Sequence, residues 1–248
     1  MAHYYLKMND DKTELLVISS KQAGQKISVP SLQVGSHSIA PTSTAKCIGV
    51  TMDSHLSMDA HISSVCRSSY YHLRNIGYLK RYLDQESLET IVHAFITSKL
   101  DYCNVLYSGL PSAQINKLQS IQNAAARILT GSRKFDHITP ALRSLHWLPV
   151  QQRIKYKSLV IIYKTVNGVA PGYLRELLQP YTPARNLRSQ NCNLLRVPFT
   201  NSNLVMTRAF SFYGPRLWNE LPHDLKSSPC LNVFKRKLKT YLFIEYFD

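Results

Sequence analysis

Residues 136–168 read DHITPALRSLHWLPVQQRIKYKSLVIIYKTVNG, a segment that mixes apolar residues with cations. Trp147 is one of two tryptophans in the chain, and Pro149 marks a predicted helix start. Proline is tolerated in a first helical turn, because its missing N–H has no helical partner there. The apolar positions of this helix are Ile154, Leu159, Ile162 and Val166. The cations in and just before it are Lys134, Arg143, Arg153, Lys155, Lys157 and Lys164. We therefore expect a core helix at the edge of a nucleic-acid site.

The composition predicts a folded protein without a membrane segment. The 248 residues are enough for one large or two small domains, and a hydrophobic fraction of 44% predicts a core. The sequence has no run of about 18 apolar residues and no secretory signal pattern at its start. We expect an intracellular protein, in the nucleus or the cytoplasm, with no membrane partner. The five widely spaced cysteines predict reduced thiols, and no metal site is predicted.

Positive charge is concentrated in one part of the chain. The formal net charge is +15, and residues 1–126 hold 11 Lys/Arg against 9 Asp/Glu. Residues 127–240 hold 19 Lys/Arg and only 4 Asp/Glu. Such an imbalance favours a polyanionic partner, with nucleic acid first, over charge that serves solubility alone.

The apolar spacing predicts a β-rich start followed by helices. Residues 4–56 contain short apolar runs separated by glycine and proline, including the runs Leu15–Ile18, Ile27–Val34 and Cys47–Met52. Helical spacing then predicts a small bundle from three segments, 58–76, 86–106 and a third over 115–129 that Gly131 ends. The remainder is predicted as a short helix at 173–178, an irregular segment at 180–208 and a basic amphipathic helix at 231–243.

Seven blocks, in order, carry a likeness to a known family. They are LKMNDDKTELLVI (6–18), CIGVTMDSHLSMDAHI (47–62), SKLDYCNVLYSGLP (98–111), LQSIQNAAARILTG (118–131), DHITPALRSLHWLPVQQRIKYK (136–157), GPRLWNELP (214–222) and FKRKLKTYLF (234–243). Together they resemble the C-terminal third of a LINE-type, non-LTR retrotransposon reverse transcriptase, and the Jockey-like group most closely. The resemblance covers essentially the entire chain.

The resemblance implies a late part of a right-hand polymerase. It implies an α+β fold, mostly α, in which a small antiparallel β remnant of the palm precedes a helical thumb bundle and a basic helical C-terminal region. The implied division is residues 1–56 for the end of the palm and the primer-grip hairpin, 57–135 for the thumb, and 136–248 for the basic region. The implied partners are RNA and DNA, as template and primer.

Candidate binding residues follow from the basic segment and from the resemblance. The cations expected to contact phosphate are Arg127, Arg133, Lys134, Arg143, Arg153, Lys155, Lys157, Arg185, Arg188, Arg236 and Lys237. The resemblance places Ile48, Gly49 and Val50 in the primer grip. Trp147 is expected in the core beside a hydrogen-bonded His146, with stacking of these rings on a base as the alternative.

The catalytic centre of the family is not expected in this chain. Polymerases of this kind hold two metal ions on palm aspartates, two of them in an aromatic–x–Asp–Asp turn. The only Asp-Asp pair is Asp10-Asp11, which follows Met8-Asn9 and matches the family's next motif instead. Lys12 matches a lysine that lies near the leaving pyrophosphate in the family, and it is the one residue with a possible chemical role. No cofactor is expected in this chain, and Mg²⁺ only in the intact parent polymerase.

Two further interpretations of the sequence stay open. The chain could be a non-functional reading frame left by a truncated retroelement, in which palm strands lack their upstream partners. It could also be a host-adopted module that binds RNA or protein. In each case we expect the chain alone to be inactive as a polymerase.

Overall fold

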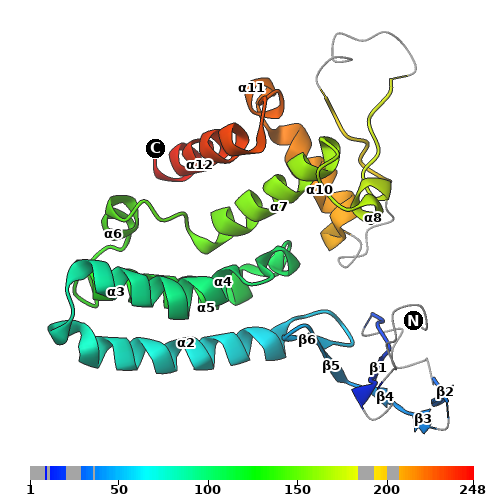
Figure 1. The fold of residues 1–248 in the computed structure, drawn as a ribbon, viewed down its shortest axis with the longest axis horizontal. Coiled ribbons are helices and arrows are strands. Elements are labelled where there is room, and N and C mark those ends of the chain that lie inside the picture. Colours follow the sequence, from blue (N-terminus) through cyan, green and yellow to red (C-terminus); the bar gives the residue numbers. More distant parts are fainter. Residues whose placement is uncertain (1–8, 10–11, 21–28, 36, 184–192, 200–206) are drawn as a thin grey trace. The chain divides into compact units, whose positions relative to one another are not determined.

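A computed structural model describes the chain except for residues 1–8, 10–11, 21–28, 36, 184–192 and 200–206 (Figure 1). The fold is mostly helical α+β with a few small two-stranded sheets, which confirms the predicted class in this coarse form. The chain forms two compact units, residues 1–64 and 65–248. The three-part division into palm end, thumb and basic region stays a prediction.

The first unit holds three pairs of short strands among its described residues. β2 (Leu32–Val34) pairs antiparallel with β3 (His37–Ile39), and β5 (Thr44–Cys47) pairs antiparallel with β6 (Val50–Asp53). β1 (Leu15–Leu16) pairs with β4 (Pro41–Thr42) in the parallel sense, so the prediction of an entirely antiparallel remnant is wrong for this pair. Two hydrogen bonds link these strands: the Thr42 hydroxyl donates to Leu15 O at 3.2 Å, and Lys46 N donates to the Glu14 carboxylate at 3.0 Å.

The run Cys47–Met52, expected as one strand, is a hairpin. Cys47 faces Val50 in the register, and the chain turns through Ile48 and Gly49. Both turn residues have positive φ, 46° and 78°, as the central residues of a type I′ turn require. Glycine adopts this backbone easily, whereas a β-branched isoleucine does so rarely. The apolar run therefore wrongly predicted one continuous strand, because Gly49 places a turn in the middle of it.

Asp53 organises the approach to the first long helix, α2 (Asp59–Leu79). Its carboxylate accepts the N–H groups of His55 at 3.0 Å, Ser57 at 2.9 Å and Met58 at 2.8 Å, and also the Ser57 hydroxyl at 3.1 Å. Partial burial acts to raise the pKa of Asp53, but these hydrogen bonds outweigh it and hold the pKa below the usual 3.8.

Replacing Asp53 with asparagine is expected to lower the free energy of unfolding by about 1 kcal/mol at neutral pH, because charge-assisted hydrogen bonds are weakened. The folded pKa is depressed, so this stabilisation is present above the unfolded pKa and is lost as the pH falls through the folded pKa. Urea unfolding should therefore show a difference from the wild type that shrinks as the pH drops from 5 toward about 2. The exposed Asp224→Asn is the control. A difference that does not change with pH would contradict the role.

The second unit is built from helices. Their bounds after α2 are Lys80–Tyr82 (3₁₀), α3 Gln85–Val92, the π-helical turn His93–Thr97, α4 Ser98–Asp101, Asn104–Tyr107 (3₁₀), α5 Ser112–Thr130, α6 Thr139–Ser144, α7 Val150–Val166, α8 Gly172–Glu176, α10 Phe210–Glu220, α11 His223–Lys226 and α12 Leu231–Phe247. Asp84 caps α3 by accepting Ser87 N at 2.8 Å. Gly131 ends α5 with φ 70°, as predicted.

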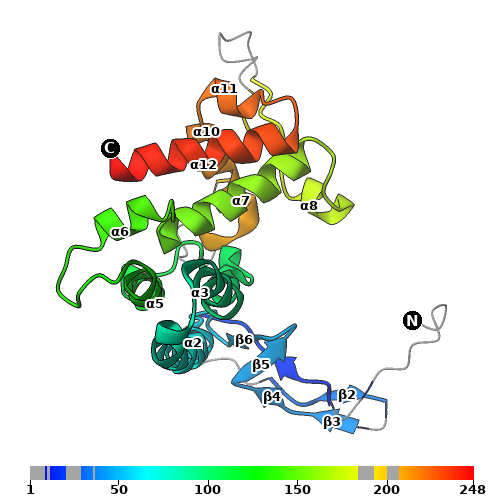
Figure 2. The same ribbon diagram turned by 60° about the vertical axis from the view of Figure 1, so that its left-hand side comes forward.

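α7 is the central helix of this unit and packs on α12, α10 and α5 (Figures 1 and 2). It begins directly after Pro149, and Gln119 of α5 accepts its first N–H, from Val150, at 2.8 Å. The predicted burial of Ile154, Leu159 and Ile162 is confirmed, whereas Val166 is exposed at the end of the helix. The core helix expected from residues 136–168 is therefore present, and its buried side extends to Thr165.

α12 completes the core through Phe234, Leu238 and Leu242, which are fully buried at intervals of four residues. The Phe234 ring stacks on Tyr163 at a centroid distance of 4.3 Å and lies 6.2 Å from the Trp218 ring. Polar atoms of these aromatic residues are satisfied inside the core: the Tyr163 hydroxyl donates to Ser228 O, and Trp218 Nε1 donates to Asn193 O, each at 2.7 Å.

Two expectations about helices need correction. The segment 86–106 is not one helix, because the chain leaves the helical conformation at Tyr102 and Cys103, which has φ 50°. α10 was not anticipated, since Gly214-Pro215 signals a break. The helix nevertheless continues through Pro215, because Leu217 and Trp218 are buried and Gly214 packs against Ile162. Among the described residues, no helix is long and apolar enough to span a membrane.

Candidate nucleic-acid interface

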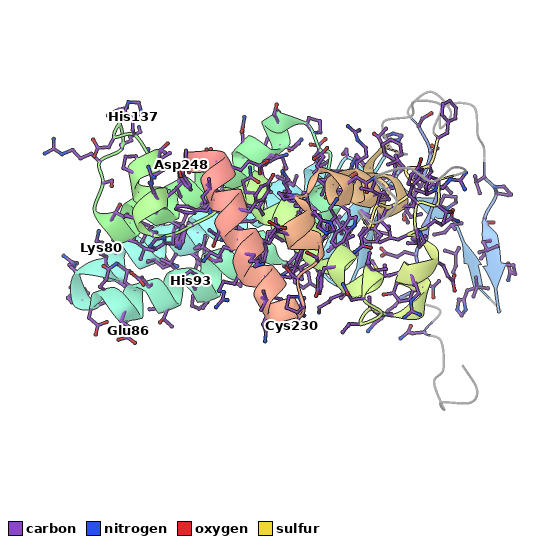
Figure 3. All side chains as sticks on the ribbon, turned by 90° about the horizontal axis from the view of Figure 1, so that it is seen from above. Lys80, Glu86, His93, His137, Cys230 and Asp248 are labelled. Atoms are coloured by element: carbon purple, nitrogen blue, oxygen red, sulfur yellow. The ribbon has the colours of Figure 1, made fainter. Side chains whose placement is uncertain are left out.

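Three of the cations expected to contact phosphate form ion pairs within the second unit. Arg153 forms a two-point pair with Asp101, with its Nε at 2.8 Å from Oδ1, and so links α7 to α4. Lys155 lies 2.9 Å from Glu245, and Arg143 lies 2.7 Å from Asp248, the residue labelled at the end of α12 in Figure 3. The last two pairs join α7 and α6 to the C-terminal end of α12. Nearby carboxylates therefore neutralise part of the positive charge.

Arg127 stabilises the loop between α5 and α6. Its guanidinium donates to Arg133 O at 3.1 Å and to Asp136 O at 3.0 Å. The loop in turn presents Arg133 and Lys134 as exposed cations, and the Lys134 ammonium lies 5.3 Å from the centroid of the exposed Phe135 ring. Of this predicted group, Arg133 and Lys134 are placed to reach an external anion, while Arg127 positions them.

Lys157, Arg236 and Lys237 are exposed, and no ion pair involves them within the described part of the chain. Lys157 lies on α7, and the other two lie on α12. Arg185 and Arg188 lie outside the described residues. The nine of these cations that the structure describes are spread over α5, the α5–α6 loop, α6, α7 and α12.

The residues taken from the resemblance lie in the first unit. Lys12 is exposed in a short 3₁₀ turn, and its backbone N–H donates to Asn9 O at 3.2 Å. Ile48 and Gly49 form the tip of the β5–β6 hairpin, where the Ile48 side chain is 82% exposed, while Val50 is buried at the start of β6. Asp10 and Asp11 lie outside the described residues. In the ranges that are described, no group of three or more acidic, histidine or cysteine side chains could hold a metal ion.

An additional surface, which we call the Arg–Tyr stripe, follows one face of α2 and continues into the 3₁₀ turn Lys80–Tyr82. It consists of Arg67, Tyr71, Arg74, Tyr78 and Arg81, all exposed. Residues seven apart on an α-helix return to nearly the same face, so Arg67 and Arg74 align, and Tyr71 and Tyr78 align beside them. Arg81 follows in the 3₁₀ turn after α2. Tyr71 and Tyr78 are 63% and 67% exposed, so a large part of each side chain is accessible to a ligand.

The surroundings of the Arg–Tyr stripe keep its charge uncompensated. Residues 60–83 contain no Asp or Glu. The other cations near α2 are used internally: Lys80 Nζ donates to Ile128 O of α5, and Lys99 Nζ donates to the Ser68 hydroxyl. Arg81 lies over the neighbouring Tyr82 ring at 4.9 Å from its centroid. Sequence reasoning missed this surface, although the seven-residue repeat of arginine and tyrosine is visible in the sequence, because only the apolar spacing of this helix was followed.

A second feature is a cleft of about 400 Å³, which we call the α7–α12 cleft. Its walls come from the π-helical turn, the α4 end, the turn 145–148, α7 and α12. Cations line it from two helices, with Arg153 and Lys157 on α7 and Lys239 on α12. His93, which is labelled in Figure 3, lines the same cleft.

The turn before α7 fixes two aromatic residues at this cleft. His146 N donates to Arg143 O at 3.1 Å and Trp147 N donates to Leu142 O at 2.9 Å, the two bonds of a Schellman cap on α6. This cap puts His146 in the left-handed region, with φ 52°. Trp147 is only 8% exposed and meets the edge of the His93 ring at 5.6 Å, so its predicted place in the core is confirmed.

Comparison of the chain with protein-family models, with curated proteins and with solved structures gives no match. The likeness to LINE-type reverse transcriptases therefore stays a resemblance of seven sequence blocks.

Proposed function

We propose that this chain binds RNA and DNA strands without sequence preference, as the part of a LINE-type RNA-directed DNA polymerase that holds template and primer beyond the catalytic centre. The observation that carries the proposal is the Arg–Tyr stripe: two aligned arginines and two exposed tyrosines on α2, with Arg81 in the turn that follows and no nearby acids in the sequence.

The stripe has the chemistry of a strand-binding surface. Arginine forms two parallel hydrogen bonds with a phosphate, and exposed tyrosine rings stack on bases of any identity. Arg67 and Arg81 are 14 residues apart, which corresponds to about 21 Å along a helix. Phosphates of one stacked strand lie about 3.4 Å apart along the axis, so the stripe spans about six nucleotides.

The remaining charge supports the same partner. The basic segment 127–240 keeps exposed cations on the α5–α6 loop and on α12 after its internal ion pairs are formed. A positive electrostatic potential over the surface raises the association rate of a polyanion even where the cations make no direct contact with it. The order of elements, a β-hairpin followed by a helical bundle, is also compatible with the end of a palm followed by a thumb.

The purified chain is expected to bind a single-stranded RNA or DNA of about ten nucleotides with an affinity that falls steeply with salt. Three phosphate contacts alone predict a slope of log K against log[salt] near −2, so affinity should fall by about twentyfold between 50 and 200 mM salt. Fluorescence anisotropy at several salt concentrations measures this slope. Affinity that is absent at low salt, or that does not respond to salt, would argue against the proposal.

Nucleotide incorporation by the same preparation on a primed template with Mg²⁺ is expected to be absent. The proposal assigns strand binding to this chain and the metal-binding aspartates to another part of the polymerase. Extension assays with a labelled primer measure this. Detectable extension that survives repurification would show that the catalytic turn had been mislocated.

A further inference from the structure

We infer that the α7–α12 cleft is a separate binding site for a single nucleotide, a phosphate monoester that carries a planar, hydrogen-bonding ring. The inference does not rest on strand binding by α2, because it concerns a different surface and a free small ligand. A volume of about 400 Å³ is within the usual range of small-molecule sites and is larger than a bare phosphate needs.

The charges at the cleft favour an anion. Arg153, Lys157 and Lys239 line it together with one acid, Asp101, and Arg153 already pairs with that acid. Lys157 and Lys239 thus supply the excess charge from two neighbouring helices, and no ion pair involves either of them among the described residues. A phosphate bound between two helices by these two ammonium groups does not have to displace a carboxylate from either of them, because Asp101 is paired with Arg153.

Asn104, a residue that lines the cleft, has a buried polar atom that lacks a partner. Asn104 is only 2% exposed, and its Oδ1 has no hydrogen-bond partner within the described structure. Its amide nitrogen has a long contact of 3.4 Å with Asp101 Oδ1. Buried polar groups are nearly always satisfied, so a buried amide without a partner at a cleft wall indicates that the partner is supplied by a ligand. An amide side chain matches the hydrogen-bonding edge of a base, which a bare phosphate does not have.

Aromatic rings and a strained residue complete the site. His93, His146 and Tyr156 line the cleft and can stack on a planar ring. His146 occupies the left-handed position of the Schellman cap, where glycine is the usual and more stable residue. The adjacent wall is a π-helical turn, a conformation that is frequent at functional sites. The His146 ring lies 5.8 Å from the Phe243 ring of α12, and a histidine at a position where glycine is preferred indicates a use for this ring.

The test is isothermal titration of the full chain with AMP, and with adenosine and inorganic phosphate as separate arms. AMP is expected to bind with a Kd in the submillimolar to millimolar range, about tenfold more tightly than either part alone. Lys157→Ala and Lys239→Ala should each raise the Kd by about tenfold. The matched control is Lys117→Ala, since Lys117 is an exposed cation of α5 that does not line the cleft. Equal losses in all three variants would overturn the site.

His146→Gly separates a ligand role from a structural one. This variant is expected to raise Tm by about 2–4 °C, because glycine suits the cap, and to weaken AMP binding at the same time. A more stable variant with unchanged AMP affinity would remove His146 from the site. Binding of inorganic phosphate as tight as AMP would overturn the nucleotide assignment. If the chain binds nucleic-acid strands but not AMP, the nucleotide site is wrong and the proposed function stands. If it binds AMP but not strands, the proposed function is wrong and the nucleotide site stands.

Discussion

Changing Arg67, Arg74 and Arg81 together to glutamate is expected to weaken binding of single-stranded RNA by about a hundredfold or more at low salt. The change removes three guanidinium groups and places three carboxylates in their positions, so attraction of phosphate becomes repulsion. The slope of log K against log[salt] should also become shallower by about two. Glutamate is a good helix former, and the three positions are exposed, so α2 should remain folded.

A matched variant tests whether this effect is local. Arg175, Arg196 and Arg216 are exposed cations outside α2, and changing all three to glutamate alters the net charge by the same amount. This control should lose much less affinity than the α2 variant, and circular dichroism should show both to be folded. Equal losses would mean that net charge, and not the Arg–Tyr stripe, determines binding.

The tyrosines of the stripe make a different contribution. Replacing Tyr71 and Tyr78 with alanine should weaken binding by about 1–3 kcal/mol per stacked base while leaving the salt slope unchanged, because stacking involves no phosphate. Anisotropy titrations at two salt concentrations separate the two contributions. If the tyrosine variant changes the slope as much as the arginine variant, the assignment of separate roles is wrong.

Replacing Trp218 with alanine is expected to lower the free energy of unfolding by about 3–5 kcal/mol, as measured by urea denaturation. Trp218 is completely buried, contacts the Phe234 ring and donates a hydrogen bond to Asn193 O. The substitution leaves a large cavity between α10 and α12 and also leaves the Asn193 carbonyl without this donor. Such a loss is a large fraction of the stability of a typical protein.

The exposed Phe135→Ala is the control for this prediction. Phe135 is 90% exposed, and its loss should change the free energy of unfolding by less than about 0.5 kcal/mol. Trp218→Phe should have an intermediate effect, because it retains the ring contact and loses the hydrogen bond. A loss below about 1 kcal/mol for Trp218→Ala would show that this cluster is not the stabilising core of the second unit.

Local patterns in the sequence were sufficient for features that depend on neighbours in the chain. Pro149 and the apolar positions after it predicted α7, and Gly131 predicted the end of α5, because each signal acts within one or two helical turns. The Ile48–Gly49 turn and α10 were missed for the opposite reason. At Ile48–Gly49 the chain turns although the residues are part of an apolar run, because both have positive φ. In α10 the helix continues through Gly214-Pro215 because Leu217 and Trp218 are buried.

The candidate sites depended on contacts between distant residues. No sequence pattern indicates that Arg153 pairs with Asp101, 52 positions earlier, or that Lys155 pairs with Glu245, 90 positions later. The α7–α12 cleft likewise assembles residues from His93 to Lys239, which only tertiary packing brings together. The Arg–Tyr stripe is the exception. The seven-residue spacing of its arginines and tyrosines is visible in the sequence and predicts a shared helix face.

The carboxylates of Glu245 and Asp248 act as internal counterions for Lys155 and Arg143. Cations elsewhere on the surface attract mobile ions from the buffer, and a bound nucleic acid gains entropy when those ions are released. Glu245 lies in the same helix as the core residues of α12 and Asp248 directly follows that helix, so both are held beside their cations at high effective concentration. A phosphate that reached Lys155 or Arg143 would displace a tethered group and release no ion to solution. The slope of log K against log[salt] therefore reports only those cations that are not already paired with a carboxylate of the chain.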